Sequence, residues 1–202
     1  MKRTKIWSGF IINRTSVHLL FLLLLVSGIA VRSEELPEAS LKELPRFHKG
    51  NEGLYRGGQP KASGFEILQA MHIKTVINFR NDNDEREDVE RLGMEHVHIP
   101  LSAWNGIQIL SVREFFKILN DPDNYPIFVH CKRGADRTGA MIAFYRIAFQ
   151  QWTPEQAYEE ARDIGLRWWY SRLKNQIRNF DLKYYMDIIH KESGEPYYNQ
   201  LR

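Results

Sequence analysis

Short apolar segments alternate with amphipathic ones along most of the chain, and several of them have the length and residue types of β-strands. These segments are Leu54–Arg56, Lys74–Phe79, Glu95–Leu101 and Tyr125–Cys131. The last of them, YPIFVHC, is the most apolar, which is typical of a strand covered on both faces. The pattern therefore predicts a sheet with this segment at its centre.

The stretches between and after these strands show the spacing of helices. Ser111 is a favourable N-cap residue in front of one such apolar face. That face consists of Val112, Phe115, Phe116 and Leu119. Met141–Phe149 is apolar nearly all round, which predicts a buried helix, and Thr153 with Pro154 forms a typical helix start. A last apolar face runs through Leu173, Ile177, Phe180, Tyr184 and Ile188.

Strands that alternate with helices favour an α/β fold. We therefore expect three layers, with a mostly parallel central sheet flanked by helices. The expected domain covers residues 51–194, and residues 195–202 form a C-terminal tail.

The first thirty residues have the three parts of an export signal. They hold basic but no acidic residues, an apolar run from Val17 to Ala30, and small residues at Gly28 and Ala30 that suit a cleavage site. Residues 1–30 are therefore expected to be a signal peptide or an N-terminal membrane anchor. A polar linker at residues 31–50 would follow. The protein would then be periplasmic, secreted or held at a membrane.

Composition narrows the classes of function. The chain has 202 residues, of which 43% are hydrophobic and 26% charged, and this excludes a disordered or multi-span membrane protein. Its formal charge of +3 comes from the N-terminal segment, so that no general affinity for nucleic acid is expected of the rest. The single cysteine, Cys131, excludes an internal disulfide framework.

Cys131 lies in the turn between the most apolar strand and the buried helix, His130–Gly139, which reads HCKRGADRTG. Such a turn directs backbone N–H groups and the positive end of the next helix into one concavity, where an anion such as phosphate can bind. Arg137 can hold two phosphate oxygens through its guanidinium. The same field favours the thiolate of Cys131 over the thiol, whose ordinary pKa is about 8.5. The sequence thus predicts an ionised nucleophile beneath a bound phosphate.

This segment resembles the H-C-x-x-G-x-x-R-[ST]-G signature of the cysteine-dependent protein tyrosine and dual-specificity phosphatases, and the resemblance covers Leu54 to about Ile189. Asp136-Arg137-Thr138 is similar to the arrangement in bacterial secreted phosphatases and myotubularins. HCKRG is similar to compact fungal and plant phosphatases, some of which act on inositol phosphates. The resemblance implies that a phosphomonoester is hydrolysed without a metal or cofactor, with Cys131 as nucleophile and Arg137 as phosphate clamp.

Other residues near the turn are expected to bind substrate or to support the loop. The substrate-binding candidates are Lys132, Arg133, Gly134, Ala135, Thr138 and Arg80. The Thr138 hydroxyl can donate to the Cys131 sulfur, and His130 can orient the loop. Lys132 and Arg133 could also form a solvated basic rim. Arg80 closes a strand and either contacts substrate or pairs with the acidic residues that follow it.

The general acid is missing from its usual place. Many members of the resembling families carry an Asp in the loop after the preceding strand, but Ser102–Gln108 contains no carboxylate. Asp136 is the favoured candidate, with a helix cap or an ion pair as its other role. The remaining candidates are Asp84, Glu85, Glu87 and Asp88. The aromatic segment Arg167–Tyr170 is expected to pack in the core rather than to lie against a membrane.

Together these features predict an exported or membrane-anchored phosphatase. Its expected substrates are phosphotyrosine or dual-specificity protein substrates, and its expected intermediate is a phosphocysteine. A phosphoinositide or inositol-phosphate phosphatase is the alternative that Lys132 and Arg133 suggest. A phosphate-binding module without turnover is the alternative of another class, because the usual acid is absent from its loop.

Overall fold

The computed structural model describes residues 41–61, 63–185 and 187 of the chain. Its sheet has the strands β1 (His48–Asn51), β2 (Leu54–Gly58), β3 (Thr75–Asn78), β4 (Glu95–His98) and β5 (Ile127–Cys131). Their order across the sheet is β1-β2-β5-β3-β4, and only the pairing of β1 with β2 is antiparallel. The predicted mostly parallel sheet is confirmed, with β5 at its centre.

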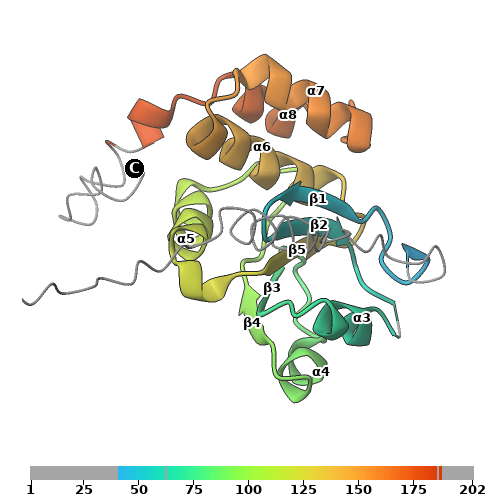
Figure 1. Cartoon of the computed structure of the whole chain (residues 1–202). Coiled ribbons are helices and arrows are strands. Elements are labelled where there is room, and N and C mark those ends of the chain that lie inside the picture. Colours follow the sequence, from blue (N-terminus) through green and yellow to red (C-terminus); the bar gives the residue numbers. More distant parts are fainter. Residues whose placement is uncertain (1–40, 62, 186, 188–202) are drawn as a thin grey trace, which may run out of the picture. The chain divides into compact units, whose positions relative to one another are not determined.

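Helices cover both faces of this sheet, which completes the predicted three-layer α/β fold (Figure 1). They are α3 (Gly64–Ala70), α4 (Arg86–Arg91), α5 (Ile109–Asn120), α6 (Asp136–Gln150), α7 (Pro154–Ile164) and α8 (Ser171–Arg178), with a 3₁₀ turn η1 at Pro122–Asn124. The larger hydrophobic cluster lies between the sheet and α5–α8, and the smaller one lies beneath α3 and α4.

The side chains of β5 alternate between these two clusters. Ile127, Val129 and Cys131 belong to the larger cluster, whereas Phe128 belongs to the smaller one. Because successive side chains of a strand point to opposite faces, His130 points away from the face that carries Cys131. The alternation therefore determines which neighbours each of the two residues meets.

Residues 41–50, which the sequence pattern placed in a linker, belong to the folded domain. Leu44 is fully buried, and His48–Asn51 forms the edge strand β1. That strand reads HKGN and has mostly exposed residues, so that it lacks the apolar alternation by which a strand is predicted. The predicted signal or anchor at residues 1–30 and the tail at 195–202 lie outside the described residues. Within the described part of the chain, no helix is long and apolar enough to span a membrane.

Several helix boundaries differ from those that the sequence predicts. Helix α5 begins at Ile109 after Gln108, so that Ser111 lies inside its first turn rather than at its N-cap. The last predicted helical face is interrupted, because α8 ends at Arg178 and Phe180 reaches the core from the turn beyond it. By contrast, the buried face of α5 and the Thr153 cap of α7, which forms a capping box, are confirmed.

Helix α5 provides a test of how the core supports the sheet. Phe115 is fully buried and packs edge-on against Phe79, with 5.5 Å between ring centroids. Truncation to Phe115→Ala leaves a cavity there and should lower the free energy of unfolding by about 3–5 kcal/mol in urea denaturation. Leu110→Ala on the exposed side of the same helix is the control and should change it by less than about 0.5 kcal/mol. Equal effects of the two substitutions would contradict this assignment of the core face.

Candidate active site

The turn between β5 and α6 lies at the carboxyl end of the central strand. Cys131 is the last residue of β5, and α6 begins at Asp136. The chain passes from β2 on one side of β5 to β3 on the other, so that the sheet changes winding direction at this strand. In parallel α/β sheets, ligands bind at the carboxyl ends of the strands next to such a switch point.

Glycines hold the turn close to β2. Gly134 has a φ angle of +74°, and a Cβ atom on it would lie 2.4 Å from the backbone of Gly57 and Gly58. A side chain at position 134 would therefore clash with the backbone and strain the turn. The two backbones touch without intervening side chains, which fixes the height of the loop above the sheet.

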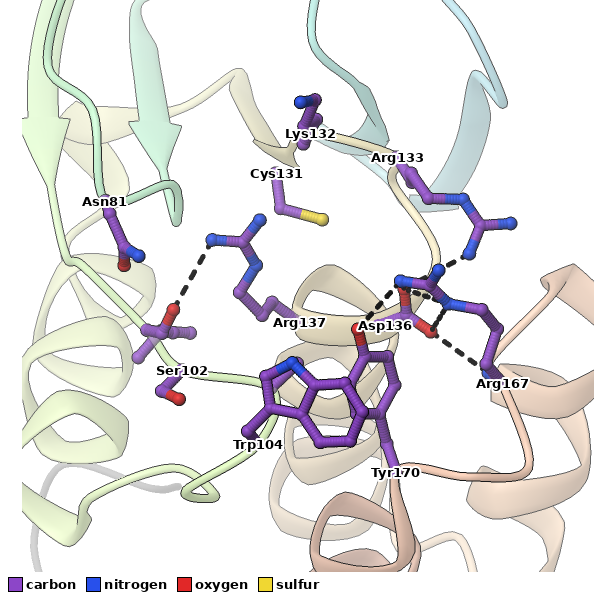
Figure 2. A pocket seen from close by; sticks show the side chains of 12 residues that line it. Asn81, Ser102, Trp104, Cys131, Lys132, Arg133, Asp136, Arg137, Arg167 and Tyr170 are labelled. Carbon is purple, nitrogen blue, oxygen red and sulfur yellow. Dashed lines mark hydrogen bonds and ion pairs between the residues drawn. The ribbon is translucent and has the colours of Figure 1, made fainter.

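A pocket of about 280 Å³ opens above this turn, and Cys131 lies at its floor (Figure 2). Its lining residues are Asn81, Leu101, Ser102, Ala103, Trp104, Cys131, Lys132, Arg133, Asp136, Arg137, Arg167 and Tyr170. The Cys131 side chain is only 1% exposed, yet its sulfur faces this pocket and accepts a hydrogen bond from the Gly134 N–H at 3.3 Å. The thiol is thus placed where a bound anion would meet it.

The Arg137 guanidinium lies beside the Cys131 sulfur, as Figure 2 shows. It donates to the carbonyl oxygens of Phe79 and Leu101 at 3.1 and 3.4 Å. None of the described carboxylates forms an ion pair with it. Backbone oxygens therefore hold the group in place, and its charge is available to an incoming anion.

Asp136 lines the pocket as expected, but both of its oxygens already accept hydrogen bonds. Arg167 donates to it from its backbone N–H, from Nε and from Nη2, the last at 2.8 Å. Arg133 adds a contact at 3.4 Å. The hydrogen bond to Asp136 raises the pKa of Arg167 despite some burial of that group. This geometry favours the ion-pair role of Asp136, and its role as general acid stays a prediction.

His130 is buried behind the turn and not in the pocket. Its Nε2 lies 2.7 Å from Oε1 of Glu85, and Oε2 of the same carboxylate accepts a hydrogen bond from the Gln59 amide. Burial opposes ionisation of Glu85, but the hydrogen bond from His130 and the nearby His96, 3.4 Å away, outweigh it and hold the pKa of Glu85 well below its ordinary value. His130 thus supports the turn through its side chain. Glu85, one of the candidate acids, is engaged beneath the loop.

The acidic segment after β3 holds Arg80 and does not reach the pocket. Arg80 forms ion pairs with Asp82 at 3.1 Å and with Asp84 at 2.8 Å. Of its two expected roles, the structure supports pairing. Asn81 and not Arg80 lines the pocket, and the substrate contact of Arg80 stays a prediction. The other acids that could have swung in, Glu87 and Asp88, lie in the first turn of α4 and are absent from the lining.

The loop after β4 forms the opposite wall. Trp104 stands on it with 67% of its surface exposed, edge-on to Tyr170 at 4.8 Å between ring centroids. Gln176 of α8 accepts from the Ile107 N–H and donates to its carbonyl, both at 2.8 Å. One amide side chain therefore ties this acid-free loop to the helical layer.

The remaining predicted residues of the turn, and the aromatic segment, agree only in part with the structure. The Thr138 hydroxyl is buried, but it has no hydrogen-bond partner among the described residues, so that its expected donation to the sulfur is not seen. Lys132 and Arg133 line the pocket, and Gly134 donates its backbone N–H to the Cys131 sulfur, whereas the expected substrate contact of Ala135 stays a prediction. The core placement of the aromatic segment holds for Tyr170 and is wrong for Trp168, which is 80% exposed.

Sequence reasoning missed several residues that line the pocket. Asn81, Trp104, Arg167 and Tyr170 reach it from three loops distant from the turn. Two of these loops follow the carboxyl ends of β3 and β4, and that placement was the signal available for Asn81 and Trp104. Arg167 and Tyr170 carried no such signal, because they lie between two helices.

Comparisons with known proteins agree with this geometry. A family model described as "DSP-PTPase phosphatase fused to NAD+ Kinase" matches residues 38–169, more than half of the chain. A protein of Dictyostelium discoideum described as "Probable tyrosine-protein phosphatase DG1060" is 32% identical over 116 residues, which are 54% of this chain and 69% of that protein. The inositol diphosphatase DSP3 of Arabidopsis thaliana is 28% identical over 144 residues, covering 67% of this chain and 70% of DSP3.

The dual specificity protein phosphatase TpbA of Pseudomonas aeruginosa is similar in both sequence and structure. It is 34% identical over 114 residues, and the match spans 55% of this chain but only 51% of TpbA. Its crystal structure superimposes with a TM-score of 0.62 at 26% identity over 70% of this chain and 88% of the crystallised one. Another TpbA crystal structure is a complex with phosphotyrosine. The chain therefore belongs to the family of dual-specificity and protein tyrosine phosphatases that the matching family model describes, and it is a cysteine-dependent phosphatase.

Proposed function

We propose that this protein hydrolyses the phosphate monoester of tyrosine side chains through a phosphocysteine intermediate on Cys131. The observation that carries the proposal is the position of the Cys131 sulfur. It lies at the floor of the pocket, accepts the Gly134 N–H at 3.3 Å and has the Arg137 guanidinium beside it. A phosphate held by these donors presents its phosphorus atom to the thiolate.

In the first step, the thiolate of Cys131 attacks phosphorus and forms a sulfur–phosphorus bond. The bond from phosphorus to the ester oxygen breaks, and the leaving oxygen keeps the electron pair and takes up a proton. Arg137 and the loop N–H groups bind the phosphoryl oxygens, on which negative charge is concentrated in the transition state. In the second step, water attacks phosphorus, the sulfur–phosphorus bond breaks, and inorganic phosphate leaves with the thiolate restored.

The shortage of a free acid in the pocket favours substrates with a good leaving group. Asp136 is the one carboxylate among the lining residues, and both of its oxygens are occupied by arginines. A tyrosine hydroxyl has a pKa of about 10, so that its phenolate departs with little assistance. The hydroxyl of serine is a much weaker acid and needs protonation as it leaves. Phosphotyrosine is therefore the preferred protein substrate in this proposal.

The walls of the pocket support the same choice. One wall is basic, with Lys132, Arg133 and Arg167, and the other presents Leu101 and the Trp104 ring. An aromatic ester can place its phosphate on the floor and its ring against Trp104. The complex of TpbA with phosphotyrosine is consistent with this choice of substrate.

An inositol phosphate is the second candidate substrate. Lys132 is exposed at the rim and Arg133 is half-buried beside it, so that both can meet a further phosphate group. The similarity to DSP3, which is named as an inositol diphosphatase, favours this candidate. A phosphate bound through an anhydride is also a good leaving group, so that the occupied Asp136 does not argue against it. A binding module without turnover is the remaining alternative.

The location of the protein is a separate proposal that rests on the sequence of residues 1–30. We propose that it is exported to a periplasm, secreted or anchored in a membrane through this segment.

Replacement of the nucleophile tests the proposed chemistry. Cys131→Ser should lower kcat/KM for a phosphotyrosine peptide by about 10⁴-fold or more, because a hydroxyl is not ionised at neutral pH. The variant should still bind phosphate with about the affinity of the unaltered protein. Phosphate release and isothermal titration measure the two quantities. Full activity of the variant would reject the covalent route, and phosphate binding without any turnover by the unaltered protein would favour the binding module.

Replacement of the carboxylate in the pocket tests the role of Asp136. Asp136→Asn frees Arg167, and we expect kcat/KM to fall by a similar factor, on the order of 10- to 100-fold, for an aryl phosphate and for an alkyl phosphate. General acid catalysis contributes about 10²–10⁴-fold and matters most for poor leaving groups. A far greater loss on the alkyl ester would therefore restore Asp136 as the acid.

Removal of the aromatic wall tests substrate preference. Trp104→Ala should lower kcat/KM for a phosphotyrosine peptide by about 3- to 10-fold, because an aromatic contact of about 0.5–1.5 kcal/mol is lost. Activity on an inositol phosphate should change less than about twofold. Trp168→Ala removes an exposed tryptophan that is absent from the pocket lining and should leave both activities as they are. A loss of the inositol phosphate activity alone would reverse the proposed preference.

A further inference from the structure

Three consecutive carbonyl groups of the loop accept hydrogen bonds from donors in residues 46–59. The Gln59 N–H donates to the Lys132 carbonyl at 3.4 Å. The Arg46 guanidinium donates to the Arg133 carbonyl at 3.3 Å. The Arg56 guanidinium donates to the carbonyl of the next residue, Gly134, at 3.1 Å.

These contacts determine where the loop N–H groups point. In a trans peptide the N–H lies opposite the C=O of the same peptide unit. A Gly134 carbonyl that is turned toward Arg56 therefore turns the Ala135 N–H in the opposite direction. The neighbouring unit shows the same arrangement, because its Arg133 carbonyl is held by Arg46 while its Gly134 N–H points at the Cys131 sulfur. Consecutive N–H groups thus converge on the pocket.

Arg56 differs from the other two donors because it is buried. It is 1% exposed, on the same face of the sheet as α6. Its guanidinium lies against Gly139 of α6, where a Cβ atom would lie 3.6 Å from Arg56 Nη2. A residue without a side chain thus packs against this charged group beneath the loop.

Nothing among the described residues neutralises this charge by direct contact. The Nε and Nη1 atoms of Arg56 have no hydrogen-bond partner there, and the group makes no ion pair within 4.0 Å. Burial lowers the pKa of Arg56 to about 10, while attraction to Glu160 and to Cys131 opposes this change. Burying a charge without a partner is costly, and such a residue persists where the charge serves another purpose.

A second buried arginine shows what a structural ion pair looks like in this protein. Arg146 is 8% exposed and donates to the Gly50 carbonyl, much as Arg56 donates to the Gly134 carbonyl. Unlike Arg56, it is paired with Glu160 at 2.6 Å and has Gln150 as a further partner. Arg146 is therefore accounted for by its contacts within the fold.

We infer that Arg56 is a positioning residue for the phosphatase reaction. Its guanidinium holds the 134–135 peptide so that the Ala135 N–H faces the phosphate, and its charge stabilises the negative charge that the thiolate and the phosphate bring to the pocket. This inference rests on the proposed function, because it needs an anion above the loop. Arg56 would then be a second cation for the reaction. It acts from beneath the loop, whereas Arg137 acts from inside the pocket.

Two substitutions in the full-length protein separate charge from geometry. Arg56→Met removes the charge and keeps an unbranched side chain. Arg56→Lys keeps the charge but loses the planar guanidinium and its several N–H donors. The first readout is the rate at which iodoacetamide alkylates Cys131 as a function of pH, which follows the thiolate fraction. The second is the dissociation constant of inorganic phosphate.

With Arg56→Met we expect the midpoint of the alkylation profile to rise by about one pH unit, so that the rate at pH values well below the midpoint falls about 10-fold. Phosphate binding should weaken about 10-fold as well. Arg56→Lys should restore the alkylation profile but not the phosphate affinity. Arg146→Met is the control, which should lower the melting temperature and leave both readouts unchanged.

Unchanged alkylation and phosphate binding in a folded Arg56→Met variant would overturn the inference. If circular dichroism shows that this variant does not fold, Arg56→Lys decides the question, and phosphate affinity equal to that of the unaltered protein would then reject the positioning role. The proposed function fails differently. In that case the unaltered protein would bind phosphate and react with iodoacetamide in the expected way, yet turn over no phosphate ester.

Discussion

A phosphatase of this type must gather negative charge at one point inside a protein, where charge is poorly tolerated. The sulfur of Cys131 and a phosphate dianion repel one another. The fold offsets this repulsion by placing the Gly134 N–H, Arg137 and the start of α6 at the same point. The parallel sheet places this point at its carboxyl edge, and the glycines of β2 let the loop come close. Because the loop must hold this charge, buried polar side chains such as Arg56 and His130 lie beneath it.

The central features could be predicted because they depend on local sequence. An apolar strand, a glycine-containing turn and a buried helix follow one another between Ile127 and Gln150, so that the proposed nucleophile and phosphate clamp could be located from neighbouring residues. The edge strand β1 was missed because it is short and polar. Arg167 was missed because its meeting with Asp136 depends on how α7 ends, and a separation of 31 positions leaves no periodic signal.

Contacts between residues far apart in the chain also decide the roles of residues whose position was predicted correctly. Asp136 lines the pocket, but its partner Arg167 comes from elsewhere in the chain and changes what the carboxylate can do. Glu85 follows a strand as a candidate acid should, yet the alternation of β5 turns His130 toward it and draws it beneath the loop. Residue type and position along the chain identify candidates, whereas the partners that a side chain acquires decide among its possible roles.

The contact between Gly134 and the end of β2 separates two tasks within the loop. At this contact backbone meets backbone, and the donors that hold the loop carbonyls come from residues 46, 56 and 59, so that no support from beneath the loop comes from the side chains at positions 132 and 133. Those side chains line the pocket near its rim. Substitutions at these two positions therefore change the charge that an incoming phosphate ester meets while the backbone contact at Gly134 is kept.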